Sequence, residues 1–399
     1  MICRLDTITP INVGTGNQIG MMDIIQDDEI IYVINIRELF NFLKEKYGSR
    51  ILKKFEAFVT GKTKTYYGGR DTELSLDKFL DKNQIFIDDV IDIPNIVKYK
   101  ANAPFVIYRD IREQIKTNNI PYIPGSSLKG AIRSALLWYH VKDNTDELIH
   151  SVRNDLNHHI PKKYIGNKFV EEFFSTKDGK YDAKYDILKF IEISDFMPAK
   201  NGNYNLSIKN VKTYSLKYNK FEPKRYDNFV ESVEGYVEGR ISLSPQIRLA
   251  IKNENEYPLL KEKLDILGLE GDSDLKEEDM INHLKNAVKE FNTWCLSEEI
   301  KLCEKASESK FPKILNGLKE RNEEKVLIRI GFSVGTIYQT LFKLIEEKDV
   351  RMAQEIVNKF KVGRYNRVID AATREIDPPY PKSIEITTDN QPMGWLKWS

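Results

Sequence analysis

The sequence predicts an α+β protein built of two successive units. Strands and helices follow one another in each half without the regular alternation of a doubly wound α/β fold. Each half also contains a strand, a glycine-containing turn and an apolar helix, at 122–137 in the first and 327–344 in the second. With 399 residues, the chain is long enough for two domains. We therefore expect one domain at 1–200 and another at 201–399.

Composition and charge exclude several classes of protein. The 61 Lys and Arg residues balance 60 Asp and Glu residues, which excludes a uniformly basic nucleic-acid binder but allows a local basic face. No apolar run approaches the ~20 residues that a membrane-spanning helix needs, and the N-terminus has no signal-peptide pattern. The three cysteines, Cys3, Cys295 and Cys303, are too few for a disulfide framework. We expect a cytoplasmic protein without a membrane partner.

The first half begins with a strand over 2–8, which we expect to end in a turn at Thr9–Gly16. Gly14 and Gly16 permit the tight backbone of such a turn. Apolar periodicity predicts a strong helix from Gly125, with Leu136 on its buried face. The other predicted elements are strands at 21–26, 30–34, 96–100 and 105–108, helices at 35–47 and 50–59, and a polar helical insertion at about 144–174.

The second half begins after a turn-rich linker at 201–205. Residues 240–252 alternate between apolar and polar, which predicts a half-buried strand, bulged or at a sheet edge because of Pro245. A charged helical insertion is expected at about 257–321. A strand at 325–330, a glycine turn at 331–335 and a helix to 345 follow, and we expect Trp395 and Trp398 to dock on the body of the protein.

The segment Pro124–Arg133 has the features of a phosphate site. A helix N-terminus offers unpaired N–H groups, and Gly125 lets a ligand approach the backbone. Two hydroxyl side chains, Ser126 and Ser127, follow, and Lys129 and Arg133 lie four residues apart on one helical face. It is not a Walker loop, because the order of its Lys and Gly is wrong. From spacing alone, a capped helix with two solvated bases is the more frequent explanation.

Residues 209–226 (KNVKTYSLKYNKFEPKRY) interleave bases with aromatic rings. They contain six bases, one acid and four aromatic residues, a pattern suited to single-stranded nucleic acid. A solvated strand pair with ordinary surface rings explains it equally well. Segments 62–70 and 363–367 have a similar character. The candidate RNA contacts here are Lys212, Lys217, Tyr218, Lys224 and Arg225.

The sequence predicts no catalytic residue, metal ligand or cofactor. His158 and His159 have no partner at metal-ligand spacing, and Cys295 and Cys303 do not form a CxxC motif. GxSxG, HExxH and GxGxxG motifs are missing. The spacing Gly331-x-x-x-Gly335 is weak evidence for a ligand, because packing is the more frequent cause of such a turn.

Four segments carry a resemblance to a known family. The opening strand with Thr9–Gly16, and the segment Tyr122–Arg133, resemble the RAMP superfamily, the RRM-like proteins of CRISPR systems. The turn Gly331–Gly335 and the ending Pro392–Lys397 are most similar to the fifth-subunit family of type III-A Csm effector complexes. The resemblance implies two tandem RRM-like (ferredoxin-like) RAMP domains that carry the helical insertions.

The resemblance also implies a function. It implies a non-catalytic RNA-binding subunit that caps the crRNA 3′ region and supports crRNA maturation and antiviral defence. The implied partners are crRNA, other Csm-type RAMP subunits and the small helical subunit, with target RNA and host nucleases as further candidates. The implied RNA contacts are Gly14, Gly16, Gly125, Ser126, Ser127, Lys129, Arg133, Gly331 and Gly335.

The late glycine turn departs from the family pattern, because Gln339 stands near the place of a Lys.

Three alternative functions remain open. A type III-B subunit or a guide-processing endoribonuclease is the first alternative. Such a nuclease usually needs a His, and His140 lies almost three helical turns from Lys129. A phosphate-binding protein for small ligands is the last alternative.

Overall fold

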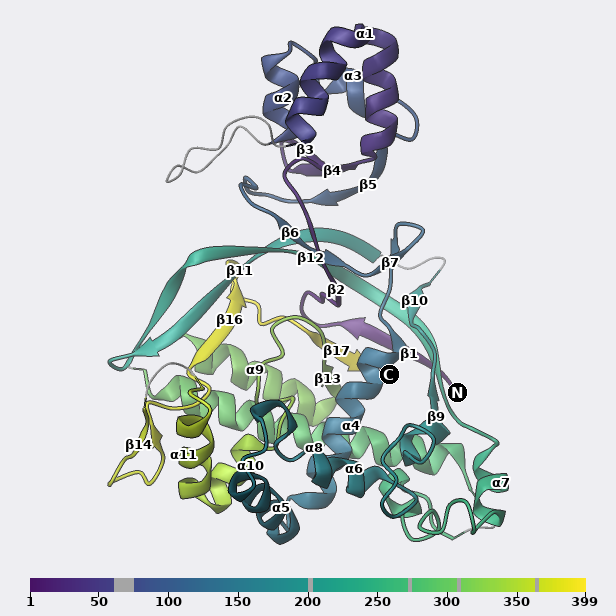
Figure 1. The fold of residues 1–399 in the computed structure, drawn as a ribbon, viewed down its shortest axis with the longest axis vertical. Helices are drawn as coiled ribbons and strands as arrows, with labels where there is room; N and C mark the ends of the chain where they lie inside the picture. Colours follow the sequence, from purple (N-terminus) through teal and green to yellow (C-terminus); the bar gives the residue numbers. More distant parts are fainter. Residues whose placement is uncertain (61–74, 200–203, 272–274, 307–309, 363–365) are drawn as a thin grey trace.

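The computed structural model describes residues 1–60, 75–199, 204–271, 275–306, 310–362 and 366–399. A long sheet arches across the molecule (Figure 1), with most of the helices below it and a small helical lobe above it. Among these residues, no helix has both the length and the apolar composition needed to cross a bilayer. The predicted loop at 62–70 lies outside the described residues, as do 201–203 of the linker and 363–365 of the basic segment.

The helices are α1 (Ile36–Val59), α2 (Leu76–Lys82), α3 (Asp88–Ile91), α4 (Gly125–Val141), α5 (Asp146–Asn157), α6 (Asn167–Phe174), α7 (Ile247–Lys252), α8 (Glu277–Glu304), α9 (Phe311–Glu324), α10 (Phe342–Lys348) and α11 (Val350–Lys359), with short 3-10 turns at Lys162–Tyr164 (η2), Ile187–Phe190 (η3) and Leu264–Leu267 (η4). The strands are β1 (Ile2–Thr7), β2 (Gly14–Ile19), β3 (Ile24–Asp27), β4 (Ile30–Ile34), β5 (Val97–Asn102), β6 (Ile111–Gln114), β7 (Lys116–Thr117), β8 (Ile120–Pro121), β9 (Ile191–Ile193), β10 (Met197–Pro198), β11 (Tyr204–Lys217), β12 (Lys220–Leu243), β13 (Leu327–Arg329), β14 (Val368–Ile369), β15 (Ile376–Asp377), β16 (Ser383–Thr387) and β17 (Trp395–Trp398).

The sheet joins the two ends of the chain. Its order is β13-β17-β1-β12-β11-β5-β4-β3, and β12 also pairs with β6, β9 and β10. The first strand, β1, is antiparallel to both β12 and the last strand, β17. Strands from both sides of residue 200 therefore share one mixed sheet, as an α+β protein allows. The division into two tandem RRM-like domains at 1–200 and 201–399 stays a prediction.

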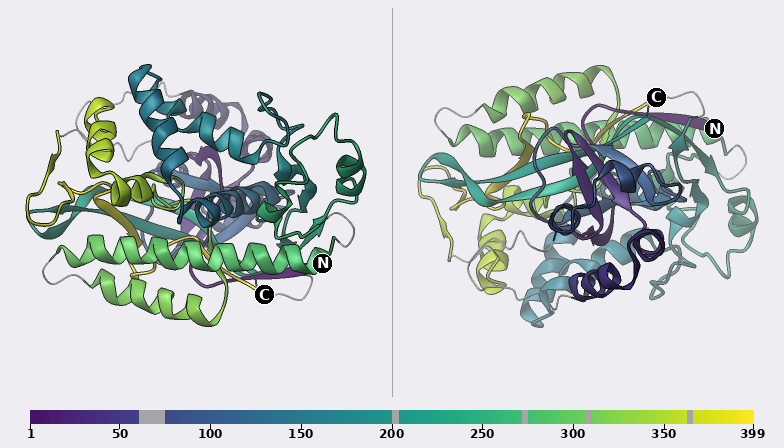
Figure 2. Two further views of the ribbon diagram at one scale, coloured as in Figure 1. Left: turned by 90° about the horizontal axis from the view of Figure 1, so that it is seen from below. Right: turned by 90° about the horizontal axis from the view of Figure 1, so that it is seen from above.

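The two largest hydrophobic cores contain most of the helix packing. The larger core lies between the sheet and helices α4, α8, α9, α10 and α11, and Figure 2 shows α8 and α9 running side by side beneath the strands. The smaller core belongs to the lobe and is formed by α1–α3 with β3 and β4. The predicted helices at 35–47 and 50–59 are confirmed as one element, α1, which kinks at Gly48, where φ is 68°. Helices also form where the insertions were predicted, as α5–α6 and α8–α9, whereas their status as insertions into two domains stays a prediction.

The prediction of a strand over 240–252 is wrong in its second part. Strand β12 ends at Leu243, and residues 247–252 form helix α7. The alternation misled because Ile247 and Ile251 also lie four residues apart, the spacing of one helical face. Both side chains are buried, whereas Leu249 is 70% exposed.

Three smaller predictions also need correction. Thr9–Gly16 is not only a turn, because Gly14 begins strand β2. The strand predicted at 105–108 is wrong, and β6 forms instead at Ile111–Gln114. The helix predicted up to 345 begins only at Phe342, because residues 335–339 form turns. The docking of the C-terminus is confirmed, since Trp395 is 0% and Trp398 is 3% exposed.

Candidate nucleic-acid interface

The segments that carry the resemblance meet at one place in the fold. The amide of Phe332 donates to the carbonyl of Asn12 at 2.7 Å, which joins the two glycine segments. The amide of Gly394 donates to the carbonyl of Pro10 at 3.0 Å, which adds the C-terminal segment. Gly331 has a φ of 82°, and a Cβ there would lie 2.0 Å from the carbonyl oxygen of Asn12. Only glycine therefore allows this approach of two backbones.

Strand β2 presents its glycines to solvent. Residues 14–18 are exposed, and their pairing with β6 contains a bulge between Gly14 and Gln18. Gly16 lies in this bulge with a φ of 90°, a conformation that L side chains rarely adopt. Thr15 donates its hydroxyl to Glu113 of β6 at 3.0 Å. The bulge therefore holds an open, side-chain-poor stretch of backbone at the surface.

A buried glutamine fixes this stretch to the neighbouring motif. Gln114 of β6 is fully buried, and its Oε1 accepts a hydrogen bond from the amide of Val13 at 2.7 Å. Its Nε2 donates to the carbonyl of Tyr122 at 2.9 Å, three residues before α4 begins. One amide side chain thus connects the N-terminal glycine segment to the segment Tyr122–Arg133.

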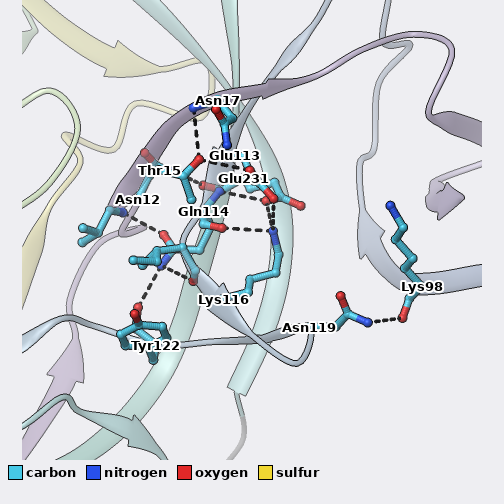
Figure 3. A network of polar contacts seen from close by, with 12 residues as sticks. Asn12, Thr15, Asn17, Lys98, Glu113, Gln114, Lys116, Asn119, Tyr122 and Glu231 are labelled. Carbon is cyan, nitrogen blue, oxygen red and sulfur yellow. Dashed lines mark hydrogen bonds and ion pairs between the residues drawn. The ribbon is translucent and has the colours of Figure 1, made fainter. Parts of the chain in front are cut away.

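A buried ion pair holds Gln114 and its strand in place (Figure 3). Glu231 of β12 is fully buried, and Lys116 pairs with its carboxylate. The same carboxylate accepts the backbone amide of Gln114 at 2.8 Å, and the carbonyl of Glu231 accepts a hydrogen bond from Asn12 at 2.8 Å. Burial raises the pKa of the Glu231 carboxyl, which the Lys116 ammonium opposes. Sequence analysis missed this network because its members come from three distant segments.

Arg112 is the exposed cation at this place, and sequence analysis missed it too. It lies on β6 opposite Gln18 of β2, and its guanidinium lies 5.0 Å from the ring centre of Phe332. Within the described part of the chain it makes no ion pair. The sequence could have indicated Arg112 through the segment 111–114 (IREQ). In a strand there, the side chain of Arg112 would point to the opposite face from the buried Ile111.

The predicted contacts in 209–226 lie on the long β11–β12 hairpin. Lys212 pairs with Asp227 at 2.6 Å, which raises the pKa of the lysine, and Lys217 pairs with Glu222 at 2.8 Å. Tyr218 lies at the tip and is 97% exposed. The strand pair is confirmed, but these ion pairs already compensate two of its cations.

The hairpin also reaches the late glycine turn. Lys224 and Arg225 are exposed on β12, and Lys224 and Gly335 line the same cavity of about 250 Å³. Gly335 is exposed, with a φ of 78°, and nothing would obstruct a side chain there. A cation from the hairpin and an open glycine backbone thus border one cavity.

Other residues of the protein already contact the start of α4. The amide of Gly125 donates to Asp195 at 2.9 Å, and a Cβ there would lie 2.3 Å from the carbonyl oxygen of Ile193. Lys129 donates to the carbonyl of Ile191 at 2.8 Å, and burial lowers its pKa. Among its hydroxyl residues, Ser126 is exposed and Ser127 is half-buried.

Arg133 is not a solvated base either. It pairs with Asp186 at 2.5 Å and lies 3.9 Å from the ring centre of Phe174. Together with Lys129, it connects η3 and β9 to α4. The two explanations given for this segment, a phosphate site and a capped helix with two solvated bases, are therefore both incomplete. The role of Lys129 and Arg133 in RNA binding stays a prediction.

The histidines do not assemble with acids into a metal site in the described structure. His140 Nε2 lies 3.3 Å from His283 Nε2, where α4 packs against α8, and burial lowers the pKa of both imidazoles. Within the described ranges, no cluster of three or more His, Cys, Asp or Glu side chains could hold a metal ion. His140 is directed to α8 rather than to the glycine segments.

The buried ion pair can be tested by a double-mutant cycle. We expect Lys116→Met and Glu231→Gln each to lower the free energy of unfolding by about 3–5 kcal/mol, because each removes one partner of a buried ion pair. The double variant should lose clearly less than the sum, as measured by urea denaturation.

The exposed pair Lys217–Glu222, with both side chains 53% exposed, is the matched control. Its coupling energy should stay within about 1 kcal/mol. Additive losses at Lys116 and Glu231 would contradict the structural role of this pair.

Comparisons with known proteins identify a family and related structures. A family model described as the RAMP superfamily matches residues 4–390. A protein of Methanocaldococcus jannaschii named CRISPR system Cms protein Csm5 is 23% identical over 407 residues, covering 100% of this chain and 88% of that protein. A protein of the same name from Streptococcus thermophilus is 30% identical over 225 residues, covering 54% of this chain and 56% of that protein.

Two solved structures share the fold. A chain in a cryo-EM structure of a Csm-crRNA-target RNA ternary complex of a type III-A CRISPR-Cas system superimposes with a TM-score of 0.70 at 22% identity, covering 100% of both chains. A crystal structure of Csm5 from T. onnurineus superimposes with a TM-score of 0.63 at 20% identity, covering 99% of both. Because the family model spans almost the whole sequence, this chain belongs to the RAMP superfamily.

Proposed function

We propose that the protein is a non-catalytic RNA-binding subunit of a type III-A CRISPR Csm effector complex. In this proposal it caps the complex at the crRNA 3′ region, supports crRNA maturation and antiviral defence, and acts in the cytoplasm beside other RAMP subunits and the small helical subunit. The similarity to proteins named Csm5 and to a chain of a Csm-crRNA-target RNA complex supports the assignment.

The convergence of the two glycine segments carries the proposal. Backbone N–H groups without side chains in front of them can approach phosphate oxygens closely, and Arg112 adds a cation between the segments. Other residues extend this surface. Lys224 and Gly335 border one cavity, the Phe332 ring lies beside the Arg112 guanidinium, and Gln18 pairs with Arg112 across β2 and β6. Such a row suits the backbone of a single strand.

The first alternative, a guide-processing endoribonuclease, has weaker support. A nuclease of this kind needs a positioned general acid and base, and His140 contacts His283 between two helices. A type III-B subunit would use the same surface, so the two assignments differ in partners rather than in chemistry. A phosphate site for small ligands at α4 has weak support as well, since Asp195 already accepts the amide of Gly125.

Arg112→Ala tests the proposed surface. We expect the Kd for a single-stranded RNA to rise roughly tenfold, because a hydrogen bond to a charged group contributes about 1.5–3 kcal/mol. The slope of log K against log salt should lose about 0.7 in magnitude, as expected for one phosphate contact on a single strand. Fluorescence anisotropy with unrelated RNAs at rising salt measures both quantities.

Arg248→Ala is the matched control for this substitution. Arg248 is an exposed arginine on α7 that makes no ion pair within the described residues. Its removal should change the affinity and the salt slope within error. Equal effects of the two substitutions would mean that only net charge matters and would remove the glycine face from the proposal.

Purified protein should not cleave RNA. Labelled precursor and mature guide RNAs incubated with Mg²⁺, Mn²⁺ or chelator should remain intact, because we infer no acid–base pair or metal cluster at the surface. His140→Ala is the informative variant. Specific product bands that vanish in this variant would favour the nuclease alternative.

A further inference from the structure

The cavity between the β11–β12 hairpin and the late glycine turn has a charge pattern that a phosphate contact alone does not explain. Its volume is about 250 Å³, and its lining comes from β11, β12, β13, β16, α8 and the turn at 333–337. Figure 1 shows β16 beside β11 of the hairpin. The charged residues of this lining are Lys224, Glu299, Arg329 and Glu385.

Two of these charges neutralise each other. The guanidinium of Arg329 donates to both carboxylate oxygens of Glu299 at 3.0 Å, and the hydroxyl of Tyr338 donates to the same carboxylate at 2.9 Å. The charged groups left for a ligand are therefore the ammonium of Lys224 and the carboxylate of Glu385.

The carboxylate of Glu385 has one oxygen without a protein partner. Thr213, which lies opposite Glu385 in the β11–β16 pairing, donates its hydroxyl to Oε1 at 2.9 Å. Within the described residues, Oε2 makes no hydrogen bond, and neither do the hydroxyls of Ser383 and Thr336 in the same lining. A carboxylate only accepts hydrogen bonds, whereas a hydroxyl both donates and accepts. These groups therefore match a hydroxyl of a ligand rather than an anion.

Cations gather at one rim of this cavity. Lys224 is exposed there, and Lys382 lies in the segment 381–383, whose other two residues line the cavity. Burial lowers the pKa of the Lys382 ammonium, and the charges of Arg367, Lys217 and Lys224 lower it further. The rim is thus locally positive in a chain of nearly balanced charge, which favours a phosphate beside the cavity.

The size and the lining of the cavity suit a sugar better than a base. A volume of about 250 Å³ is below the roughly 300–1,000 Å³ of pockets for drug-sized ligands. Nucleobases commonly stack on aromatic rings, and none of the described residues in this lining is aromatic. In RNA, the ribose 2′-hydroxyl lies next to the phosphate of the same nucleotide. A sugar in the cavity can therefore keep its phosphate at the rim.

We propose that this cavity holds one ribose of the bound strand and recognises its 2′-hydroxyl, which donates to Glu385 and accepts from Ser383 or Thr336. The adjoining phosphate then lies against Lys224. The inference rests on the proposed RNA-binding function and adds selection of RNA over DNA without preference for any base. The 2′-hydroxyl is the group by which a protein distinguishes these two nucleic acids.

Competition binding of the full chain to uniform strands tests the inference. Oligo-uridine RNA is compared with oligo-deoxyuridine of equal length and with the 2′-fluoro strand, which keeps an RNA-like sugar pucker but has no hydroxyl to donate. We expect the RNA to bind about tenfold more tightly than either, as for one hydrogen bond to a charged group. Equal affinities of the RNA and the 2′-fluoro strand would overturn the inference, because sugar shape alone would then explain any preference.

Glu385→Gln is the informative variant. The amide oxygen of the new side chain can still accept from Thr213, whereas its NH₂ group replaces the second accepting oxygen. The ratio of the DNA Kd to the RNA Kd should fall from about ten to about one. Loss of the charge acts on both strands alike, so this ratio isolates the hydrogen bond.

A second variant and a matched control complete the test. The double substitution Ser383→Ala and Thr336→Ala keeps the carboxylate and should lower the ratio about threefold, with an unchanged melting temperature. Glu238→Gln removes an exposed carboxylate far along β12 from Lys224 and should keep the ratio. An unchanged ratio in either cavity variant, or an equal fall in Glu238→Gln, would overturn the inference.

Two results separate this inference from the proposed function. If Arg112→Ala weakens RNA binding while wild-type protein binds RNA and DNA equally, the ribose site fails and the proposed RNA-binding surface stands. If the wild-type protein binds none of these strands, the proposed function fails and the inference that rests on it fails as well.

Discussion

The buried carboxylate of Glu231 is the constraint on which the candidate site depends. A charged group inside the sheet is costly unless it is paired and hydrogen-bonded, and here both kinds of partner come from β6 and the residues that follow it. These contacts of Glu231 therefore fix β6 against β12. Gln114 then holds Val13 and Tyr122, and the backbone of Asn12 receives Phe332. Segments more than 300 residues apart in sequence are thus placed together by one polar network.

The surface that results combines open backbone with few cations. A chain with a net charge of +1 could therefore still bind RNA. The proposed contacts use backbone amide groups and single, separated basic side chains rather than a basic patch. Several of the lysines and arginines that are predicted to contact RNA also make contacts within the protein. Lys129 fastens β9, Arg133 fastens η3, and Lys212 pairs across the hairpin. Intramolecular pairing and RNA contact compete for the same charged side chains. The exposure and pairing of a side chain therefore indicate an RNA contact better than the composition of its segment does.

Much of the fold could be predicted from local sequence patterns. The strong apolar stripe of α4, the strand pair β3–β4 and the docking of Trp395 and Trp398 followed from periodicity or from apolar character. Residues 247–252 could not be predicted, because one apolar pattern fits both a strand and a short helix. The glycine residues of the site were identified from the resemblance. Arg112 was missed because tertiary pairing, not sequence spacing, places it beside the glycine segments.

Amide hydrogen exchange of the full chain, with and without single-stranded RNA, tests the central claim most directly, because it reports on backbone groups rather than on charge. If the two glycine segments form the RNA-binding face, RNA should slow exchange in peptides covering 14–19 and 331–336 and leave peptides from the middle of α4 unchanged. Slower exchange confined to the start of α4 or to the hairpin tip at 217–220, with the glycine segments unaffected, would contradict the account.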